Sequence, residues 1–392
     1  MTVVAINWLA YRITSSASTL GLINFAGQVP VLLFTVFAGV WLDRVDLRRA
    51  LMVTQSLALA QSFLLATLVF THSATIPLLT LLVFLQGVIN AFDMPGRHAF
   101  MIEMIEDKTD LSNAIALNSF MVNTARLVGP AIAGILIAWL GEGFCFLIDG
   151  FSYMAVILSL SLMHTGIPQK HTPKKSMWHE LAESSLYAYR FLPIRLVLFY
   201  LAFFSIVAVP FNVLLPVYAA KIFNQGADSY GFMMGAVGLG ALTGALLMSM
   251  RKTPLGLGRI MMLAGLGFSG SLMVFAYSTF WWFSLLCLVG VGIGYITLVV
   301  SVNTFLQTVV EDHMRSRIMG LFSLSFIGMV PIGSALIGVM ASTFGAPKTL
   351  LIHSGICLVA VWVFYLQLPR IRILVRPLYM QKGILPQAQI LD

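Results

Sequence analysis

Two stripes of polar residues run along segments of the chain that are otherwise apolar. The first stripe comprises Gln86, Asn90, Asp93 and Arg97, and the second comprises Ser119, Asn123, Arg126 and Pro130. Both follow the spacing i, i+4, i+7, i+11, which places all four members on one face of a helix. Because polar side chains within a bilayer face protein or water, we expect these stripes to line a cavity and a gate. The alternative is that they form hydrogen bonds between helices.

Arg126 and Asp149 are charged residues that lie inside long apolar segments. An unpaired charge at mid-bilayer costs about 2.5–3.5 kcal/mol on insertion scales. Arg126 is therefore either a contact for an anion, a substrate or a coupling charge, or a structural residue bonded to carbonyls and amides. Asp149 is either a proton-coupling carboxylate or a capping or interface residue near the outer side. The heights of the two residues, about 21 Å and about 9 Å below the outer helix ends at 1.5 Å per residue, disfavour a direct pair.

The sequence carries none of the motifs that would indicate other kinds of chemistry. It contains no HExxH or similar paired-ligand spacing, no Gly-x-Ser-x-Gly elbow and no GxxxxGK[ST] phosphate loop. The three cysteines are scattered through apolar segments and are interpreted as small buried hydrophobes. We therefore expect no enzyme activity, no metal and no cofactor.

Composition places the protein in a membrane. Of its residues, 59% are hydrophobic and only 10% charged, whereas soluble domains carry about 25% charged residues. Apolar stretches long enough to span a bilayer are predicted at 17–42, 50–70, 76–95, 114–140, 143–164, 194–220, 229–250, 259–277, 279–302, 316–343 and 348–368. Residues 1–11 are apolar but too short to span alone. We expect Asn212, which lies between Pro210 and Pro216, to line a hinge or the cavity.

Basic residues alternate between the connections and so predict the orientation of the chain. Of the 23 Lys and Arg residues, 19 fall in every second connection or in the tail. Cytoplasmic loops carry such an excess of basic residues, so both ends of the bundle are predicted to be cytoplasmic. The net charge of +8 is thereby explained by orientation and contact with anionic lipid, and no nucleic-acid partner is expected.

The chain divides into two similar halves. The largest polar connection begins at Thr165, and Glu106-Asp107 before it corresponds to Glu311-Asp312 after it. Similar segments separated by about half the chain length predict two duplicated six-helix halves. This organisation is found in secondary transporters, which have a substrate site at the interface between the halves. We predict an N-terminal bundle at 1–164, a linker at 165–193, a C-terminal bundle at 194–368 and a cytoplasmic tail at 369–392.

A short basic turn joins the first two predicted spans. It contains Gly39, Asp43, Arg44, Arg48 and Arg49. Only seven residues separate the spans, so their helices must be antiparallel neighbours, and Gly39 would let another helix approach closely. The pattern Gly-x-x-x-Asp-Arg-x-x-Arg-Arg resembles the signature of the major facilitator superfamily. Asp46 and Leu47 depart from it, because many members have a glycine and a basic residue there.

Three further segments are similar to the efflux branch that includes the enterobactin exporter. They lie at 90–97, 113–119 and 126–134, and the last contains Gly129, Pro130 and Gly134, a partial match to the helix-5 motif of antiporters. Glycine and proline at these positions predict a kinked, thin helix. The same resemblance places Trp8 to Ser16 at the outer end of a first helix whose beginning is missing.

The resemblance implies an all-α membrane protein with the major facilitator fold, two pseudo-symmetric six-helix bundles with a truncated first helix. It implies a monomer in the bacterial inner membrane that exports a drug, siderophore or metabolite by proton-coupled alternating access. Asp93 and Arg97 would join the basic turn in a cytoplasmic gate, with Gln86, Asn90, Asn123, Arg126, Asp149 and Asn212 as cavity or coupling residues. The alternative is a non-transporting membrane sensor or an inactive truncated transporter.

Overall fold

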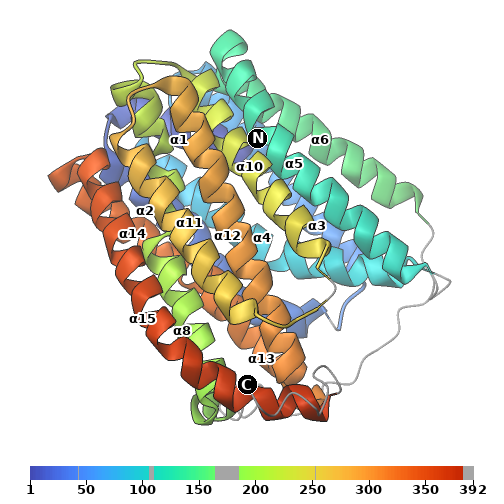
Figure 1. Ribbon diagram of the computed structural model, residues 1–392. Coiled ribbons are helices and arrows are strands. Elements are labelled where there is room, and N and C mark those ends of the chain that lie inside the picture. The colour runs from blue at the N-terminus through green and yellow to red at the C-terminus, as the bar shows by residue number, and fades with distance from the viewer. Residues whose placement is uncertain (43, 106–109, 164–184, 252, 383–392) are drawn as a thin grey trace. The chain divides into compact units, whose positions relative to one another are not determined.

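The computed structural model describes residues 1–42, 44–105, 110–163, 185–251 and 253–382, and these residues form helices joined by short connections (Figure 1). The first six helices are α1 Thr2–Thr14, α2 Ala17–Leu42, α3 Leu47–Phe70, α4 Ile76–Glu103, α5 Leu111–Leu140 and α6 Glu142–Leu162. After the linker come α8 Leu192–Val207, η1 Val209–Leu214, α9 Leu215–Val217, η2 Tyr218–Ile222, α10 Ala227–Ser249 and α11 Leu257–Tyr277. The chain continues through α12 Trp281–Val309, α13 Asp312–Ser323, η3 Leu324–Gly328, α14 Val330–Phe344 and α15 Ala346–Gln381.

Ten helical stretches in the described residues are long and apolar enough to cross a membrane. They match ten of the eleven predicted spans. The remaining span, predicted at 114–140, is helical throughout as part of α5, and among the described residues it contains the apolar stretch Thr124–Leu140.

The chain forms two compact units that each combine segments distant in sequence. Unit 1 comprises Met1–Lys174, Phe211–Gly238 and Ser334–Ala346, and unit 2 comprises Lys175–Pro210, Leu239–Gly333 and Pro347–Asp392. The predicted boundaries at residues 164 and 194 describe a division by sequence, and that division stays a prediction.

Aromatic side chains and small residues pack the helices of unit 1. Phe63 of α3 meets Phe151 of α6 edge to face at 5.6 Å between ring centroids. One end of the same helix pair is closed by Phe70 and Phe144 at 5.3 Å. Such edge-to-face pairs add to the stabilisation that comes from burial. The packing of α3 against α6 is therefore stabilised at two places along the pair.

The span that begins with α8 is broken near Pro210, as the sequence predicts. A 3₁₀ segment, η1, follows α8 there, because proline cannot donate the backbone hydrogen bond that would continue the helix. The carbonyl of Val207 is bonded instead by Nδ1 of the buried His353 on α15, at 2.7 Å. Gly333 lies against the neighbouring carbonyl of Ile206. Unit 2 thus satisfies the backbone at the break through a side chain from another helix.

Candidate functional site

Asp93 is the centre of a buried polar cluster that joins α3 and α4. The side chain of Asp93 is only 6% exposed. Its Oδ1 atom accepts hydrogen bonds from Thr54 Oγ1 at 3.0 Å and from Gln55 Nε2 at 2.6 Å. Its Oδ2 atom forms an ion pair with Arg97 one turn further along α4. Because hydrogen bonds to a charged group are stronger than neutral ones, this cluster can hold the ends of two helices together.

The basic turn between α2 and α3 packs beside this cluster. Trp41, at the end of α2, meets the ring of Phe92 edge to face at 5.6 Å. Leu51 of α3 lies close enough to Gly96 that a Cβ there would be 3.2 Å from Leu51 Cδ2. The turn and the Asp93–Arg97 segment are therefore neighbours in unit 1, as the sequence predicts.

The arginines of the turn have different partners, and Arg49 forms an ion pair with Asp46 at 3.6 Å. Arg48 donates to the carbonyl oxygens of Leu160 and Ser161, each at 2.6 Å, and so caps the C-terminal end of α6. Asp46, which departs from the superfamily signature, accepts from the backbone N–H of Arg49 and is the N-cap of α3. Arg44 is exposed. Asp43, the acidic member of the predicted motif, lies outside the described residues.

Gly39 does not provide the expected close approach to another helix. A Cβ built on it meets nothing within 4 Å. The reason is helix geometry, because residues two apart point about 200° apart around a helix. Trp41 faces α4, so Gly39 lies on the far side of α2.

The polar stripe on α4 divides into two bonded pairs. Gln86 Nε2 donates to Asn90 Oδ1 at 3.2 Å, and both residues are half-buried. The pair Asp93–Arg97 follows one turn later. On α5 the side chain of Asn123 is not among those that the structure describes. Arg126, on the same helix, is exposed. Asp149 is half-buried, and no bond between Asp149 and Arg126 is found within the described part of the chain.

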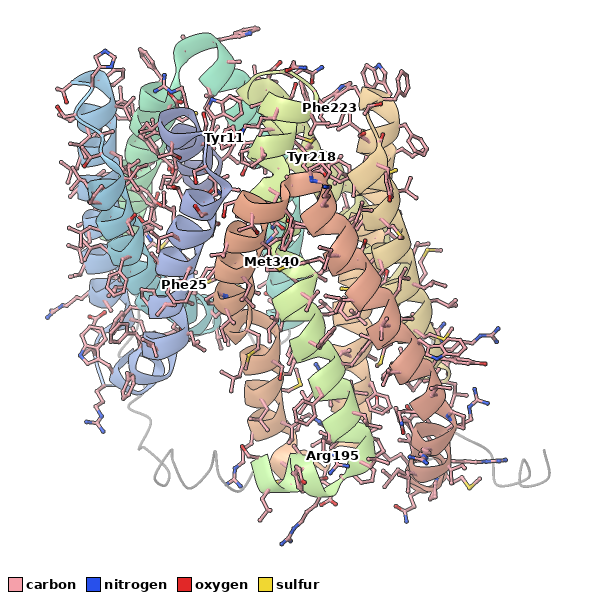
Figure 2. The ribbon with its side chains drawn as sticks, turned by 90° about the vertical axis from the view of Figure 1, so that its left-hand side faces the viewer. Tyr11, Phe25, Arg195, Tyr218, Phe223 and Met340 are labelled. Atoms are coloured by element: carbon pink, nitrogen blue, oxygen red, sulfur yellow. The ribbon has the colours of Figure 1, made fainter. Side chains whose placement is uncertain are left out.

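A second buried network, which the sequence did not reveal, connects α1, α2 and α10 within unit 1. Asn24 Nδ2 donates to Asn7 Oδ1 at 2.7 Å, and Asn7 Nδ2 lies 3.5 Å from the hydroxyl of Tyr230. Asn7 and Tyr230 are 5% and 1% exposed, and the ring of Trp8 stacks on that of Tyr230. Tyr11, one turn after Trp8 and labelled in Figure 2, is buried as well. The polar interior of unit 1 therefore includes these amides and a phenol besides the polar residues of α4.

A charged pair fixes the other end of α1. Arg12 Nε lies 3.1 Å from Glu142 Oε1, and the Glu142 side chain is only 4% exposed. Asn212, predicted to line a hinge or the cavity, lies in η1 two residues after Pro210, so the structure places it at the break in the helix.

Among the described residues of unit 1, glycines in backbone contact make two crossings that join a helix of the first half of the sequence to one of the second half. A Cβ added to Gly134 of α5 would lie 2.7 Å from Ala227 O and 2.8 Å from Gly231 Cα on α10. A Cβ added to Gly21 of α2 would lie 2.6 Å from Ser334 O and 2.9 Å from Gly338 Cα on α14. Gly129, in contrast, has nothing within 4 Å, and α5 stays helical across Pro130. Of the three predicted helix-5 residues, Gly134 is thus the one that permits close packing.

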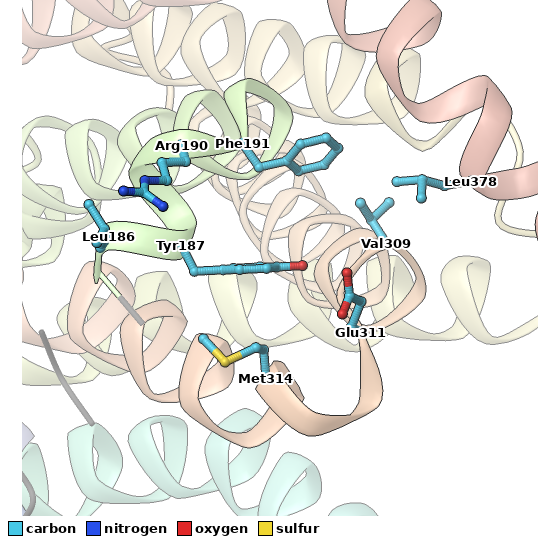
Figure 3. A pocket seen from close by; sticks show the side chains of 8 residues that line it. All are labelled: Leu186, Tyr187, Arg190, Phe191, Val309, Glu311, Met314 and Leu378. Atoms are coloured by element: carbon cyan, nitrogen blue, oxygen red, sulfur yellow. The ribbon is translucent and has the colours of Figure 1, made fainter. Parts of the chain in front are cut away.

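Unit 2 holds a pocket of about 440 Å³ beside the end of α12. It is lined by Leu186, Tyr187, Arg190, Phe191, Val309, Glu311, Met314 and Leu378. Figure 3 shows the Tyr187 hydroxyl directed toward the Glu311 carboxylate, while the guanidinium of Arg190 turns away. Burial, and to a lesser extent the negative charge of Glu311, raise the pKa of Tyr187 above its ordinary value, so the phenol stays protonated at neutral pH. The predicted site included none of these residues.

The sequence of this chain matches a family model along nearly its whole length. The model is described as a transmembrane secretion effector and covers residues 1–375. The chain belongs to this family of major facilitator transporters. The predicted superfamily, the all-helical fold and the membrane location are thereby confirmed.

Relatives of known role are transporters. The chain is 25% identical to a staphyloferrin A transporter of Staphylococcus aureus, over 92% of this chain and 91% of the relative. It is 25% identical to the multidrug efflux pump Tap of Mycolicibacterium fortuitum, over 95% and 92% of the two chains. Over a shorter region, 59% of this chain and 55% of the relative, it is 27% identical to an enterobactin exporter of Escherichia coli. The predicted similarity to the enterobactin-exporter branch is confirmed.

A solved structure supports the same fold for this transporter. The crystal structure of a point mutant of the nucleoside transporter NupG superimposes with a TM-score of 0.73 over 93% of this chain and 96% of that one. The identity of 13% limits this likeness to the fold.

The transporter has functional candidates that periodicity alone could not find. Thr54 and Gln55 were missed, although two adjacent polar residues in a predicted apolar span were a usable signal. Asn7 and Asn24 were missed because the contacts that join them to each other and to Tyr230 connect different segments. Tyr230 stands near the start of a predicted span, where a tyrosine is normally interpreted as an interface anchor.

Proposed function

We propose that this transporter exports a siderophore or a drug-like molecule across the bacterial inner membrane by alternating access, with protons moving inward in exchange. It acts as a monomer, and its basic connections face the cytoplasm. The relatives support this substrate range, because they are named for staphyloferrin A, for enterobactin and for multiple drugs.

The observation that carries the mechanism is the pair of glycine crossings. Each crossing joins a helix of the first half of the sequence, α5 or α2, to a helix of the second half, α10 or α14. The glycine-to-glycine contact itself is apolar backbone packing, so it can separate without leaving buried charges unpaired. Such a contact is suited to a surface that must form and break in every transport cycle.

The Asp93 cluster is assigned to the cytoplasmic gate. Its carboxylate uses both oxygens, one for Thr54 and Gln55 and the other for Arg97. Movement of α4 against α3 would exchange these bonds for water, which gives the gate two defined arrangements. Asn90, Gln86, Arg126 and the Asn7–Asn24–Tyr230 network supply amide, guanidinium and phenol groups for a polar solute inside unit 1. Asp149 remains the candidate carboxylate for proton coupling.

The experiment that tests this proposal is efflux from bacteria whose own pumps have been deleted. Cells expressing the chain are loaded with ethidium, with a citrate-based siderophore or with a catecholate siderophore, and loss of each compound is followed with and without a protonophore. Export of at least one compound that stops when the proton gradient collapses is expected. Retention of all three by cells that contain the protein in their membrane would contradict the proposal. A membrane sensor is not favoured, because the relatives are named as transporters, pumps or exporters.

A further inference from the structure

The last helix is longer than a bilayer requires. α15 contains 36 residues, which at 1.5 Å per residue extend about 54 Å, whereas the hydrocarbon core is about 30 Å thick. Pro369 and Pro377 lie inside the helix, and proline bends helices by removing a backbone bond. Figure 1 shows the darkest red end of α15 turning aside near the C-terminal end of α12. We call residues 369–382 the basic strap.

One face of the basic strap is docked on unit 2. Ile371, Val375 and Tyr379, spaced four residues apart, are 4%, 3% and 8% exposed. Lys382 Nζ donates to the carbonyl oxygens of Thr308 and Val310, at 2.7 and 3.2 Å. A lysine on the last carbonyls of a helix is a favourable cap. The strap is therefore held in place and presents its opposite face outward.

The outward face combines exposed apolar and basic residues. Ile373 is 71% exposed and Leu374 is 42% exposed, while Arg370 and Arg372 are exposed and Arg376 is half-buried. The strap contains no acidic residue. A largely exposed isoleucine between arginines is poorly suited to water, but the same combination is suited to a membrane surface, where apolar side chains insert and basic ones meet phosphates.

We propose that the basic strap binds anionic phospholipids of the cytoplasmic leaflet. Arg370, Arg372 and Arg376 bind the headgroup phosphates, and Ile373 and Leu374 insert among the acyl chains. The partner is a lipid because the face has an apolar component that free phosphate would not engage. Since the inner face of the strap is bonded to the end of α12, lipid binding also holds that end of unit 2 at the membrane surface. The proposal depends on the predicted cytoplasmic position of the tail, and it does not depend on which solute is exported.

The test uses the purified full chain in a neutral detergent, with an environment-sensitive dye attached at Gln381→Cys. This position is exposed, and the three native cysteines are buried, which favours labelling at the new site. Short-chain phosphatidylglycerol, short-chain phosphatidylcholine and inorganic phosphate are titrated separately. The strap variant Arg370→Gln/Arg372→Gln/Arg376→Gln is compared with Lys221→Gln/Lys348→Gln, which removes two exposed lysines from connections predicted to lie on the outer side of the membrane.

Saturable binding of phosphatidylglycerol is expected, with weaker binding of phosphatidylcholine and no comparable response to phosphate. Each basic residue near an anionic surface contributes about fivefold, so the strap variant should lose roughly 100-fold in apparent affinity. The matched control should stay within about twofold of the parent chain. Equal affinity of the strap variant and the parent for phosphatidylglycerol, or equal binding of both lipids by the parent, would overturn the proposal. A full response to phosphate alone would replace the lipid by a free anion and would overturn it as well.

Discussion

Substituting Gly134 by alanine should push α5 and α10 apart and shift the transporter toward the state in which this crossing is open. The new Cβ would lie 2.7 Å from Ala227 O and 2.8 Å from Gly231 Cα, whereas ordinary contact begins at 3.4 Å, a shortfall of 0.6–0.7 Å. The opposing atoms are backbone, so no side chain can rotate away. Gly129→Ala is the matched control on the same helix, because its Cβ would meet nothing within 4 Å.

The expected magnitude follows from two opposing contributions. Overpacking in a well-packed interface costs about 1–3 kcal/mol, and replacing glycine by alanine inside a helix gains about 1 kcal/mol. The helix gain is common to both variants, so the two should differ by about 1–3 kcal/mol in the closed state. A difference of that size corresponds to roughly a 5- to 150-fold change in the ratio of closed to open molecules.

Spin labels at Trp139→Cys and Lys221→Cys provide the assay. Trp139 is 82% exposed near the end of α5, and Lys221 is exposed shortly before α10. Distance distributions between the two labels should contain a larger long-distance population in Gly134→Ala than in Gly129→Ala. Identical distributions in the two variants would refute the conclusion that backbone contact at Gly134 holds this crossing closed.

Three further substitutions test the polar contacts. Asp93→Asn replaces the carboxylate that both Gln55 and Arg97 engage and should reduce efflux at least about tenfold, because a buried charge pair loses one partner; Asp46→Asn, which can still cap α3, should retain efflux. His353→Phe leaves the Val207 carbonyl without its donor and should lower the unfolding free energy by about 1–3 kcal/mol, whereas His353→Gln, which restores an N–H donor, should recover part of the loss in thermal unfolding. Arg12→Gln removes the ionic partner of the buried Glu142 and should lower the unfolding temperature; the exposed pair Arg49–Asp46 serves as the comparison, since Arg49→Gln should change it little. Equal unfolding temperatures for Arg12→Gln and Arg49→Gln would show that the Glu142 pair contributes nothing beyond a surface pair.

Hydropathy and charge placed most helices correctly, but they located the helix ends less well. The span predicted at 76–95 is part of α4, Ile76–Glu103, and the span predicted at 348–368 is part of α15, Ala346–Gln381. Hydropathy detects the apolar stretch that crosses the bilayer, and in these two segments that stretch ends before Arg97 and before Arg370. The helices continue because charged side chains at these positions find partners or water outside the apolar core, while the backbone keeps its hydrogen bonds.

The candidate site could be predicted only as far as local periodicity reaches. The spacing of Gln86, Asn90, Asp93 and Arg97 placed them on one face, and the pairs Gln86–Asn90 and Asp93–Arg97 lie one turn apart on it. The partners of Asp93 on α3, 38 and 39 residues away, and the bond between Asn7 and Tyr230, 223 residues apart, depend on tertiary packing. Periodicity within one segment carries no information about which other segment will be its neighbour.

The central claim, proton-coupled export by this chain, is tested most directly by proton movement in proteoliposomes. The purified chain is reconstituted with a pH-sensitive dye inside the vesicles, and a compound identified by the efflux panel is added outside without any imposed gradient. Substrate-driven proton flux in the opposite direction is expected, and it should be absent with Asp93→Asn. Substrate uptake at a normal rate without any proton movement would contradict the coupling. A correctly folded chain that moves neither substrate nor protons would contradict transport itself.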